Sequence, residues 1–208
     1  IMLAEVFKEF DSIHKEYANK YSNFESGEFD LAYFYNERAN VSIFAGAVWR
    51  QNPKNNLVLE EYSCDKDNEH PPENETNVST YKGRRDLWFC LGESQFRCEA
   101  KQKWWSLDNL EEEKLISAIE LAGVESSKVE KKFIDSKNTA LGMVFVTLKI
   151  KRSNLENVSS YLVQLGNLIK KHQADNLYVH SLILDEVINS LGETSILYPG
   201  VLVFVKKA

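Results

Sequence analysis

The chain has few of the residues that interrupt or cross-link small folds. Its 208 residues include 9 glycines, 4 prolines and 3 cysteines, with no internal repeat. This composition excludes collagen-like and low-complexity chains, and an odd, widely spaced set of cysteines excludes a disulfide scaffold. The four histidines are scattered and form no zinc-binding pattern. We therefore expect a globular protein in a reducing, cytoplasmic compartment.

Long apolar runs and an excess of basic charge are also missing. No stretch approaches the roughly 18 apolar residues of a membrane helix, and the first residues lack the pattern of a signal peptide, so we expect no membrane partner. The 25 basic and 31 acidic residues give a net charge of −6, whereas autonomous duplex binders usually present a basic surface. Basic residues nevertheless gather in one stretch, at Lys82, Arg84, Arg85, Arg97, Lys101 and Lys103.

The chain has enough apolar residues to form one hydrophobic core, since 43% of its residues are hydrophobic and 12% are aromatic. We predict a single α/β domain over 1–208, with a central mixed sheet flanked by helices. An N-terminal helical extension (1–35) and a C-terminal α/β extension (151–208) would border a core at 36–150. An apolar stripe predicts the first helix; it holds Leu3, Val6, Phe7, Phe10, Ile13 and His14.

Later elements follow from apolar periodicity and from turn residues. Strands are expected at 57–62, 141–150, 176–184 and 195–205, and helices at 155–172 and from Ser106 to Ala122, with Gly123 ending the latter. Prolines, asparagines and charges predict an exposed loop from Cys64 to Thr80. That interpretation is favoured over a metal cluster of Asp65, Asp67, Glu69 and His70, because nothing fixes the geometry of these four.

The most informative segment is Gly83 to Trp105, GRRDLWFCLGESQFRCEAKQKWW, which predicts two antiparallel strands joined by a short turn. Strand alternation places Phe96, Cys98 and Ala100 on one face. Glu99 and Lys101 then share the other face. Acid-x-Lys patterns recur elsewhere in the chain, but this copy lies within an alternating apolar strand.

Asp86 lies on the strand before, although the sequence does not fix whether it faces the same side as Glu99. Two carboxylates and a lysine suit phosphodiester hydrolysis, which needs acidic ligands for a divalent cation and a positive group near the attacking water or the phosphate.

A helix expected from Asn36 to Arg50 carries a further carboxylate. Glu37 lies four residues before Val41 and so falls on the apolar face, where it serves either a site or the helix dipole. The following strand carries Glu60 and Glu61. Their opposite parity predicts that only one of them shares a face with the site.

The order helix, strand, strand, strand, helix, with 12 residues between Asp86 and Glu99, resembles the PD-(D/E)xK nuclease superfamily, whose fold is restriction-endonuclease-like. The segments GRRDLWF and CEAKQKW also look like an uncharacterised bacterial group with a Gly-Arg-x-Asp-Leu-Trp hairpin. The resemblance implies that Asp86 and Glu99 bind Mg²⁺ or Mn²⁺. It further implies that Lys101 assists the water or stabilises charge, and that Glu37 is the helix carboxylate. Arg85 stands where the superfamily has its proline.

Arg84, Arg85, Lys103 and Trp104 are the expected nucleic-acid contacts, with DNA as the first substrate and RNA as the second. Trp88 and Trp105 could also stack on bases, while Trp104 or Trp105 could instead cover the core.

Three hypotheses therefore stand. The protein is a metal-dependent nuclease, a silent nuclease-fold protein that binds nucleic acid or a protein partner, or an unrelated α/β protein in which Asp86, Glu99 and Lys101 form a surface ion-pair ladder. The sequence gives no oligomeric state.

Overall fold

The computed structural model describes residues 2–67, 80–127 and 137–208. One mixed sheet of six strands runs through the molecule in the order β1-β2-β3-β4-β6-β5. The strands are β1 (Leu57–Asp67), β2 (Thr80–Leu91), β3 (Ser94–Ser106), β4 (Asn138–Lys151), β5 (Leu177–Ile183) and β6 (Ile196–Lys207). β3 and β4 are parallel, and every other neighbouring pair is antiparallel. The predicted single α/β domain with a mixed sheet is confirmed.

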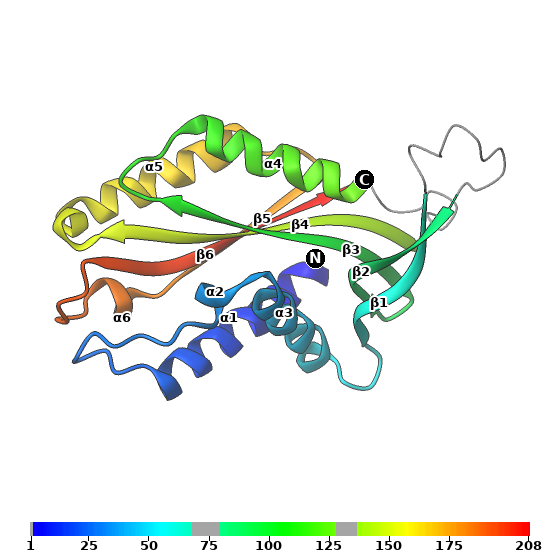
Figure 1. Cartoon of the computed structure of the whole chain (residues 1–208), viewed down its shortest axis with the longest axis horizontal. Coiled ribbons are helices and arrows are strands. Elements are labelled where there is room, and N and C mark those ends of the chain that lie inside the picture. The colour runs from blue at the N-terminus through cyan, green and yellow to red at the C-terminus, as the bar shows by residue number, and fades with distance from the viewer. Residues whose placement is uncertain (1, 68–79, 128–136) are drawn as a thin grey trace.

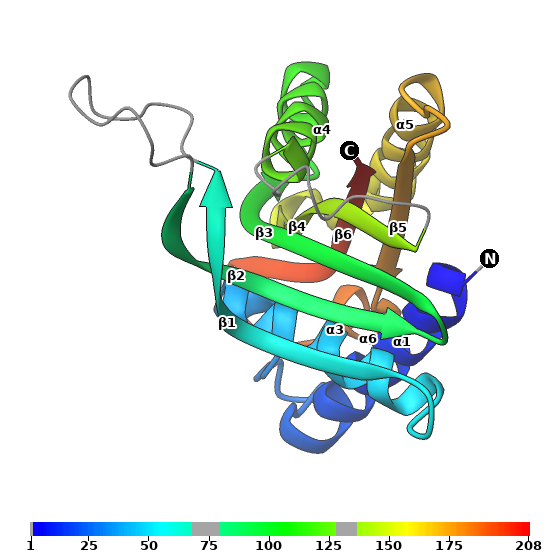
Figure 2. The ribbon, with the colours of Figure 1, turned by 90° about the vertical axis from the view of Figure 1, so that its right-hand side faces the viewer.

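Helices cover both faces of this sheet (Figure 1). One face carries α1 (Met2–Tyr21), α2 (Ala32–Tyr35), α3 (Glu37–Gln51) and the short α6 (Asp185–Ile188). The other carries α4 (Glu112–Ser127) and α5 (Val158–Lys171), which follows a 3₁₀ turn at Arg152–Asn157. Figure 2 shows that β1 and β2 extend away from α4 and lie over α3. In the hairpin that carries Asp86 and Glu99, α3 therefore packs against both strands, and β3 also packs against α4 on the other face.

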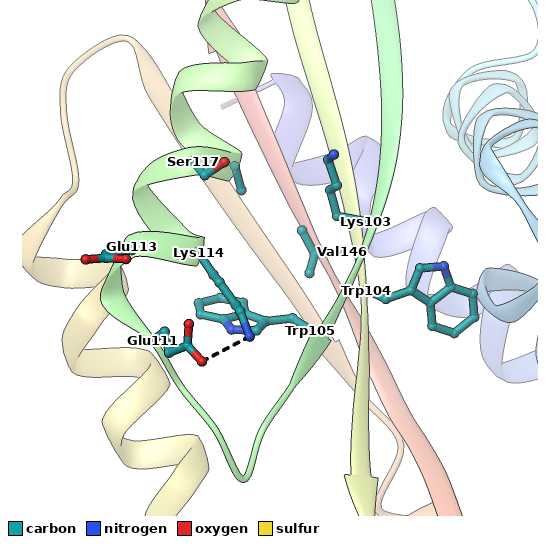
Figure 3. A pocket seen from close by; sticks show the side chains of 9 residues that line it. Lys103, Trp104, Trp105, Glu111, Glu113, Lys114, Ser117 and Val146 are labelled. Carbon is teal, nitrogen blue, oxygen red and sulfur yellow. Dashed lines mark ion pairs between the residues drawn. The ribbon is translucent and has the colours of Figure 1, made fainter.

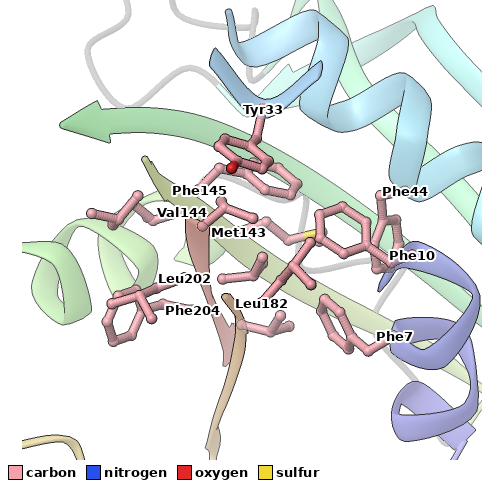
Figure 4. Packing of buried hydrophobic residues seen from close by; sticks show 14 of the residues in the cluster. Phe7, Phe10, Tyr33, Phe44, Met143, Val144, Phe145, Leu182, Leu202 and Phe204 are labelled. Carbon is pink, nitrogen blue, oxygen red and sulfur yellow. The ribbon is translucent and has the colours of Figure 1, made fainter. Parts of the chain in front are cut away.

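The core forms where β4 passes between the two helical layers, and this explains its nearly continuous apolar sequence. Phe145 points toward α1, where its ring stacks on that of Phe10 with centroids 6.3 Å apart. Val144 points to the opposite side, beside Phe204 of β6 and toward α4 (Figure 4). Gly142 lets α4 approach closely, because a Cβ there would collide with the carbonyl oxygen of Ala122.

Two predicted boundaries differ from the structure. The helix expected from Ser106 begins at Glu112 instead, because β3 continues to Ser106 and the Ser106 hydroxyl donates to Asp108 at 2.6 Å in the following turn. The same helix continues through Gly123 to Ser127, so Gly123 does not end it.

The expected loop from Cys64 to Thr80 is shorter, because β1 extends to Asp67 and β2 begins at Thr80. The rest of that segment, with Glu69 and His70, lies outside the described residues. No helix within 2–67, 80–127 and 137–208 is long and apolar enough to cross a membrane.

His14, predicted on the apolar stripe of α1, is buried with 1% of its surface exposed. Its ring contacts Phe10 edge-on and lies 5.4 Å from the Tyr33 ring. Neither ring nitrogen has a hydrogen-bond partner within the described parts of the chain. Burial disfavours the charged imidazolium and lowers the pKa of His14 to about 3.

We expect this histidine to make folding pH-dependent. The unfolded chain binds a proton on His14 near pH 6.5 and the folded chain only near pH 3, so stability is lost as the pH falls between these values, by about 1.4 kcal/mol per unit. Urea unfolding at pH 7 and pH 5 should show a smaller loss for His14→Leu than for the wild type. Equal losses would contradict the buried neutral imidazole.

Candidate functional site

The site begins where β2 and β3 separate. Their ladder runs from Leu91↔Ser94 to Leu87↔Cys98 and ends there. Continued by one residue, this register sets Asp86 opposite Glu99, as the nuclease hypothesis requires. Beyond Cys98, the edge of β3 that faces β2 carries backbone N–H groups without a strand partner, and these need other acceptors.

Two carboxylates take the place of the missing strand. Asp86 Oδ2 accepts a hydrogen bond from the backbone N–H of Ala100 at 2.6 Å. The Glu37 carboxylate lies beside the backbone N–H of Gln102, two residues further along the same edge, and this N–H lowers its pKa. Lys101 completes the group, because its Nζ donates to the Ala100 carbonyl at 2.6 Å and lies 3.8 Å from Glu37 Oε2. We call Glu37, Asp86 and Lys101 the edge site.

The first turn of α3 positions Glu37. The Asn36 side chain caps this helix by accepting from the N–H of Ala39 at 2.9 Å, so Glu37 is held at the helix start, pointing at β3. Burial raises the pKa of Glu37; the positive charge of Lys101 opposes this shift, and the negative charge of Asp86 adds to it. A carboxylate in these surroundings favours a nearby cation.

A hollow of about 140 Å³ adjoins the edge site. Its lining residues come from α3, β1 and β2, and are Glu37, Arg38, Val41, Ser42, Glu60, Glu61 and Asp86. Both Glu60 and Glu61 line this hollow, although alternation predicted only one. Glu61 has a left-handed backbone with φ of 48°, which breaks the alternation of β1 opposite Asp86.

The hollow's rim is charged and hydrogen-bonded. Ser42 Oγ donates to Glu60 Oε2 at 2.7 Å. Glu61 bridges two arginines, with Oε1 2.8 Å from Arg38 Nε and Oε2 3.1 Å from Arg84 NH1. Both arginine side chains are more than two-thirds exposed.

Glu99 has a different partner from the one expected. Its Oε1 lies 2.6 Å from Arg85 NH1, in an ion pair whose side chains are 6% and 2% exposed. A buried carboxylate needs a counter-charge, and here the guanidinium of Arg85 supplies it. Arg85 was expected at the nucleic-acid surface and is instead buried, whereas its neighbour Arg84 is exposed.

The two remaining predicted contacts lie on opposite sides of the sheet (Figure 3). Lys103 lines a pocket of about 310 Å³ between β3 and α4, together with the buried Trp105. Trp104 also contributes to the lining of this pocket, but its ring points away from the other lining side chains (Figure 3) and contacts that of Phe34 in α2. Trp105 is thus the tryptophan that covers the core, and Trp104 is the exposed one.

Sequence reasoning missed Arg38, Gln102 and the amide of Ala100. Arg38 and Ser42 are one helical turn apart on α3, opposite the adjacent Glu60 and Glu61. That spacing could have indicated that Arg38 and Ser42 share a helix face. The amides carried no signal, because any residue supplies a backbone N–H.

The donor chemistry of the edge site fits Mg²⁺ or Mn²⁺. These are hard cations that prefer oxygen ligands, and Mg²⁺ usually takes one or two carboxylates together with water and substrate phosphate. Asp86 and Glu37 supply that number. In the described part of the chain, no group of three or more His, Cys, Asp or Glu could hold a metal ion.

Comparison with protein-family models, curated proteins and solved structures finds no match for this chain. Its function is therefore inferred from the chemistry of the site.

The two adjacent arginines give a test of the buried ion pair. Arg85→Met should lower the free energy of unfolding by about 3–5 kcal/mol, because it leaves the Glu99 carboxylate buried without this counter-charge. Arg84→Met is the matched control and should cost less than about 1 kcal/mol, since the Arg84 pair is exposed. Urea unfolding at pH 7 measures both, and similar losses would contradict the arrangement.

Proposed function

We propose that the protein hydrolyses phosphodiester bonds in nucleic acid with the help of Mg²⁺ or Mn²⁺, DNA being the first substrate to test and RNA the second. One observation carries the proposal: two carboxylates and a lysine meet on the open edge of β3. That combination offers ligands for a cation and a positive group beside them, which phosphodiester hydrolysis needs. The buried cysteines, Cys90 and Cys98, are free, which agrees with the expected cytoplasmic location.

Asp86 and Glu37 are the carboxylates already in position. The hydrogen bond from the Ala100 amide orients Asp86, and Glu37 lies beside the Gln102 amide, so the opening has one carboxylate from each side. A bound Mg²⁺ or Mn²⁺ would polarise the phosphate and lower the pKa of a water molecule. Glu99 is the second ligand expected from the sequence. It would join the edge site if the bound cation replaced the Arg85 guanidinium as its counter-charge.

Lys101 would stabilise the negative charge that grows on the phosphate, or orient the attacking water. Its present contacts do not hinder this role. The Lys101–Glu37 pair is 3.8 Å long and about one-third exposed on both sides, so it contributes about 1 kcal/mol or less and is easily exchanged. An incoming phosphate therefore competes with Glu37 for Nζ at little cost.

Arg84 and Arg38 are placed to hold the phosphate backbone. Arg38 lines the hollow beside Asp86, and Arg84 adjoins it through Glu61, which forms an ion pair with both arginines. Phosphate contacts of this kind position a substrate without specifying its sequence. They also supply local positive charge in a protein whose net charge is −6. Lys103 and Trp104 stay as proposed contacts further along β3.

The second candidate is a silent nuclease-fold protein that binds nucleic acid or a protein partner. The observation that favours it is the buried Arg85–Glu99 pair, because it engages one of the two carboxylates expected to bind the cation. In that case the edge site would bind phosphate or a basic partner without hydrolysis.

Cleavage of labelled single- and double-stranded DNA and RNA separates these candidates. With Mg²⁺ or Mn²⁺ the wild type should cleave, and EDTA should stop it. Asp86→Asn and Lys101→Ala should each lower the rate by at least about a hundredfold, because each removes charge that stabilises the transition state. Asn keeps an oxygen acceptor for the Ala100 amide, so the fold is preserved.

Lys15→Ala, an exposed lysine on α1, is the control and should cleave like the wild type. Binding without cleavage would favour the silent protein. Cleavage that survives in both Asp86→Asn and Lys101→Ala would place any nuclease activity outside the edge site.

A further inference from the structure

Four aromatic rings gather on the surface next to the edge site: Phe34 and Tyr35 of α2, Trp104 of β3 and Tyr198 of β6. We call them the aromatic patch. Phe34, Tyr35 and Trp104 are exposed over 40%, 54% and 44% of their surface. Single exposed apolar residues are common on proteins, but contiguous ones mark binding surfaces. These residues touch one another and form one surface.

The rings meet edge to face. The Phe34 centroid lies 5.3 Å from that of Trp104 and 4.7 Å from that of Tyr198, with interplanar angles of 85° and 64°. Trp104 and Tyr198 are 5.5 Å apart at 78°. The rings are steeply inclined and do not stack face to face, and Phe34 and Trp104 keep about two-fifths of their surface exposed to a planar ligand.

Buried hydrogen bonds hold the patch in place. The Tyr33 hydroxyl donates to the Tyr198 carbonyl at 2.7 Å, which ties α2 to β6. The Tyr33 carbonyl accepts from Thr147 Oγ1 at 2.8 Å and from Gln102 Nε2 at 3.3 Å, which ties α2 to β4 and β3. The patch is thus preformed, so a ligand would not have to order it.

The patch is continuous with the edge site on both sides. Tyr35 precedes the Asn36 cap and Glu37, and Trp104 follows Lys101 by three residues, about 10 Å along a strand. Gln102 links the two, because its backbone N–H lies beside the Glu37 carboxylate and its side chain donates to the Tyr33 carbonyl. Lys101 and Trp104 leave β3 on opposite faces, but Lys101 Nζ lies at the strand edge beside Glu37. A nucleotide chain that passes this edge would have a phosphate at Nζ and a neighbouring base on the Trp104 side.

We infer that the protein takes single-stranded nucleic acid and stacks unpaired bases on the aromatic patch; this inference rests on the proposed function of the edge site. Bases in a duplex are paired and stacked, and their faces cannot reach protein rings. Stacking adds about 1–3 kcal/mol per base to the phosphate contacts, and this contribution does not depend on the net charge of the protein. It therefore suits a chain with net charge −6, which lacks the charge excess typical of duplex binders.

Binding in EDTA tests the inference independently of cleavage. The probes are a labelled oligodeoxythymidylate, an oligouridylate of the same length and a DNA duplex, followed by fluorescence anisotropy. The wild type should prefer a single strand to the duplex, and the two single strands decide between DNA and RNA. Trp104→Ala should weaken single-strand binding by about fivefold to a hundredfold, at low and at high salt alike, because stacking releases no counterions.

Two variants serve as controls. Trp104→Phe keeps an aromatic ring and should retain most of the affinity. Trp49→Ala removes a tryptophan on α3 that is 54% exposed and lies outside the aromatic patch, and it should bind like the wild type.

The outcomes separate the two proposals. Single-strand binding that depends on Trp104 without any cleavage would reject the nuclease and keep the inference. Cleavage by a protein whose single-strand affinity is unchanged in Trp104→Ala would keep the nuclease and overturn the inference. A preference for duplex, or no binding to any probe, would also overturn it and leave a protein partner for the patch.

Discussion

The unpaired backbone amides at the edge of β3 are the constraint on which the rest of the site depends. A buried N–H group without an acceptor costs about 1–3 kcal/mol, so the opening between β2 and β3 must bring acceptors with it. Asp86 meets that need at Ala100, and the Glu37 carboxylate lies beside the amide of Gln102. Satisfying the backbone therefore concentrates negative charge at one point, and Lys101 balances part of it. The same contacts that complete the fold assemble the groups that we propose for catalysis.

Charge balance then explains the placement of the arginines. Arg85 is buried, where it forms an ion pair with the buried Glu99. Its neighbour Arg84 is exposed and forms an ion pair with Glu61. A buried pair of this kind adds little net stability, but breaking it by removing one partner is costly. Arg85 is thus a buried counter-charge in this conformation, and Arg38 and Arg84 are the exposed arginines that we propose for phosphate contacts.

Much of this arrangement could be predicted from alternation and helix periodicity. The hairpin, the helix with Glu37, the buried Cys98 and Ala100, and the extension of the sheet by β5 and β6 all follow from local patterns. The left-handed backbone of Glu61 could not be predicted, since nothing in its sequence requires it. The burial of Arg85 had a signal, because alternation along β2 puts it on the face of the buried Leu87 and Phe89. Its pairing with Glu99 on the next strand had none.

The central claim is that a divalent cation binds at the edge site, and Mn²⁺-induced broadening of amide NMR signals tests it most directly. Mn²⁺ broadens nearby resonances, so the amides of Ala100, Gln102 and Glu37 should weaken first in a titration. Asp86→Asn should abolish this pattern, while Asp185→Asn, an exposed aspartate of α6, should leave it intact. Broadening centred elsewhere, or an unchanged pattern in Asp86→Asn, would contradict the account.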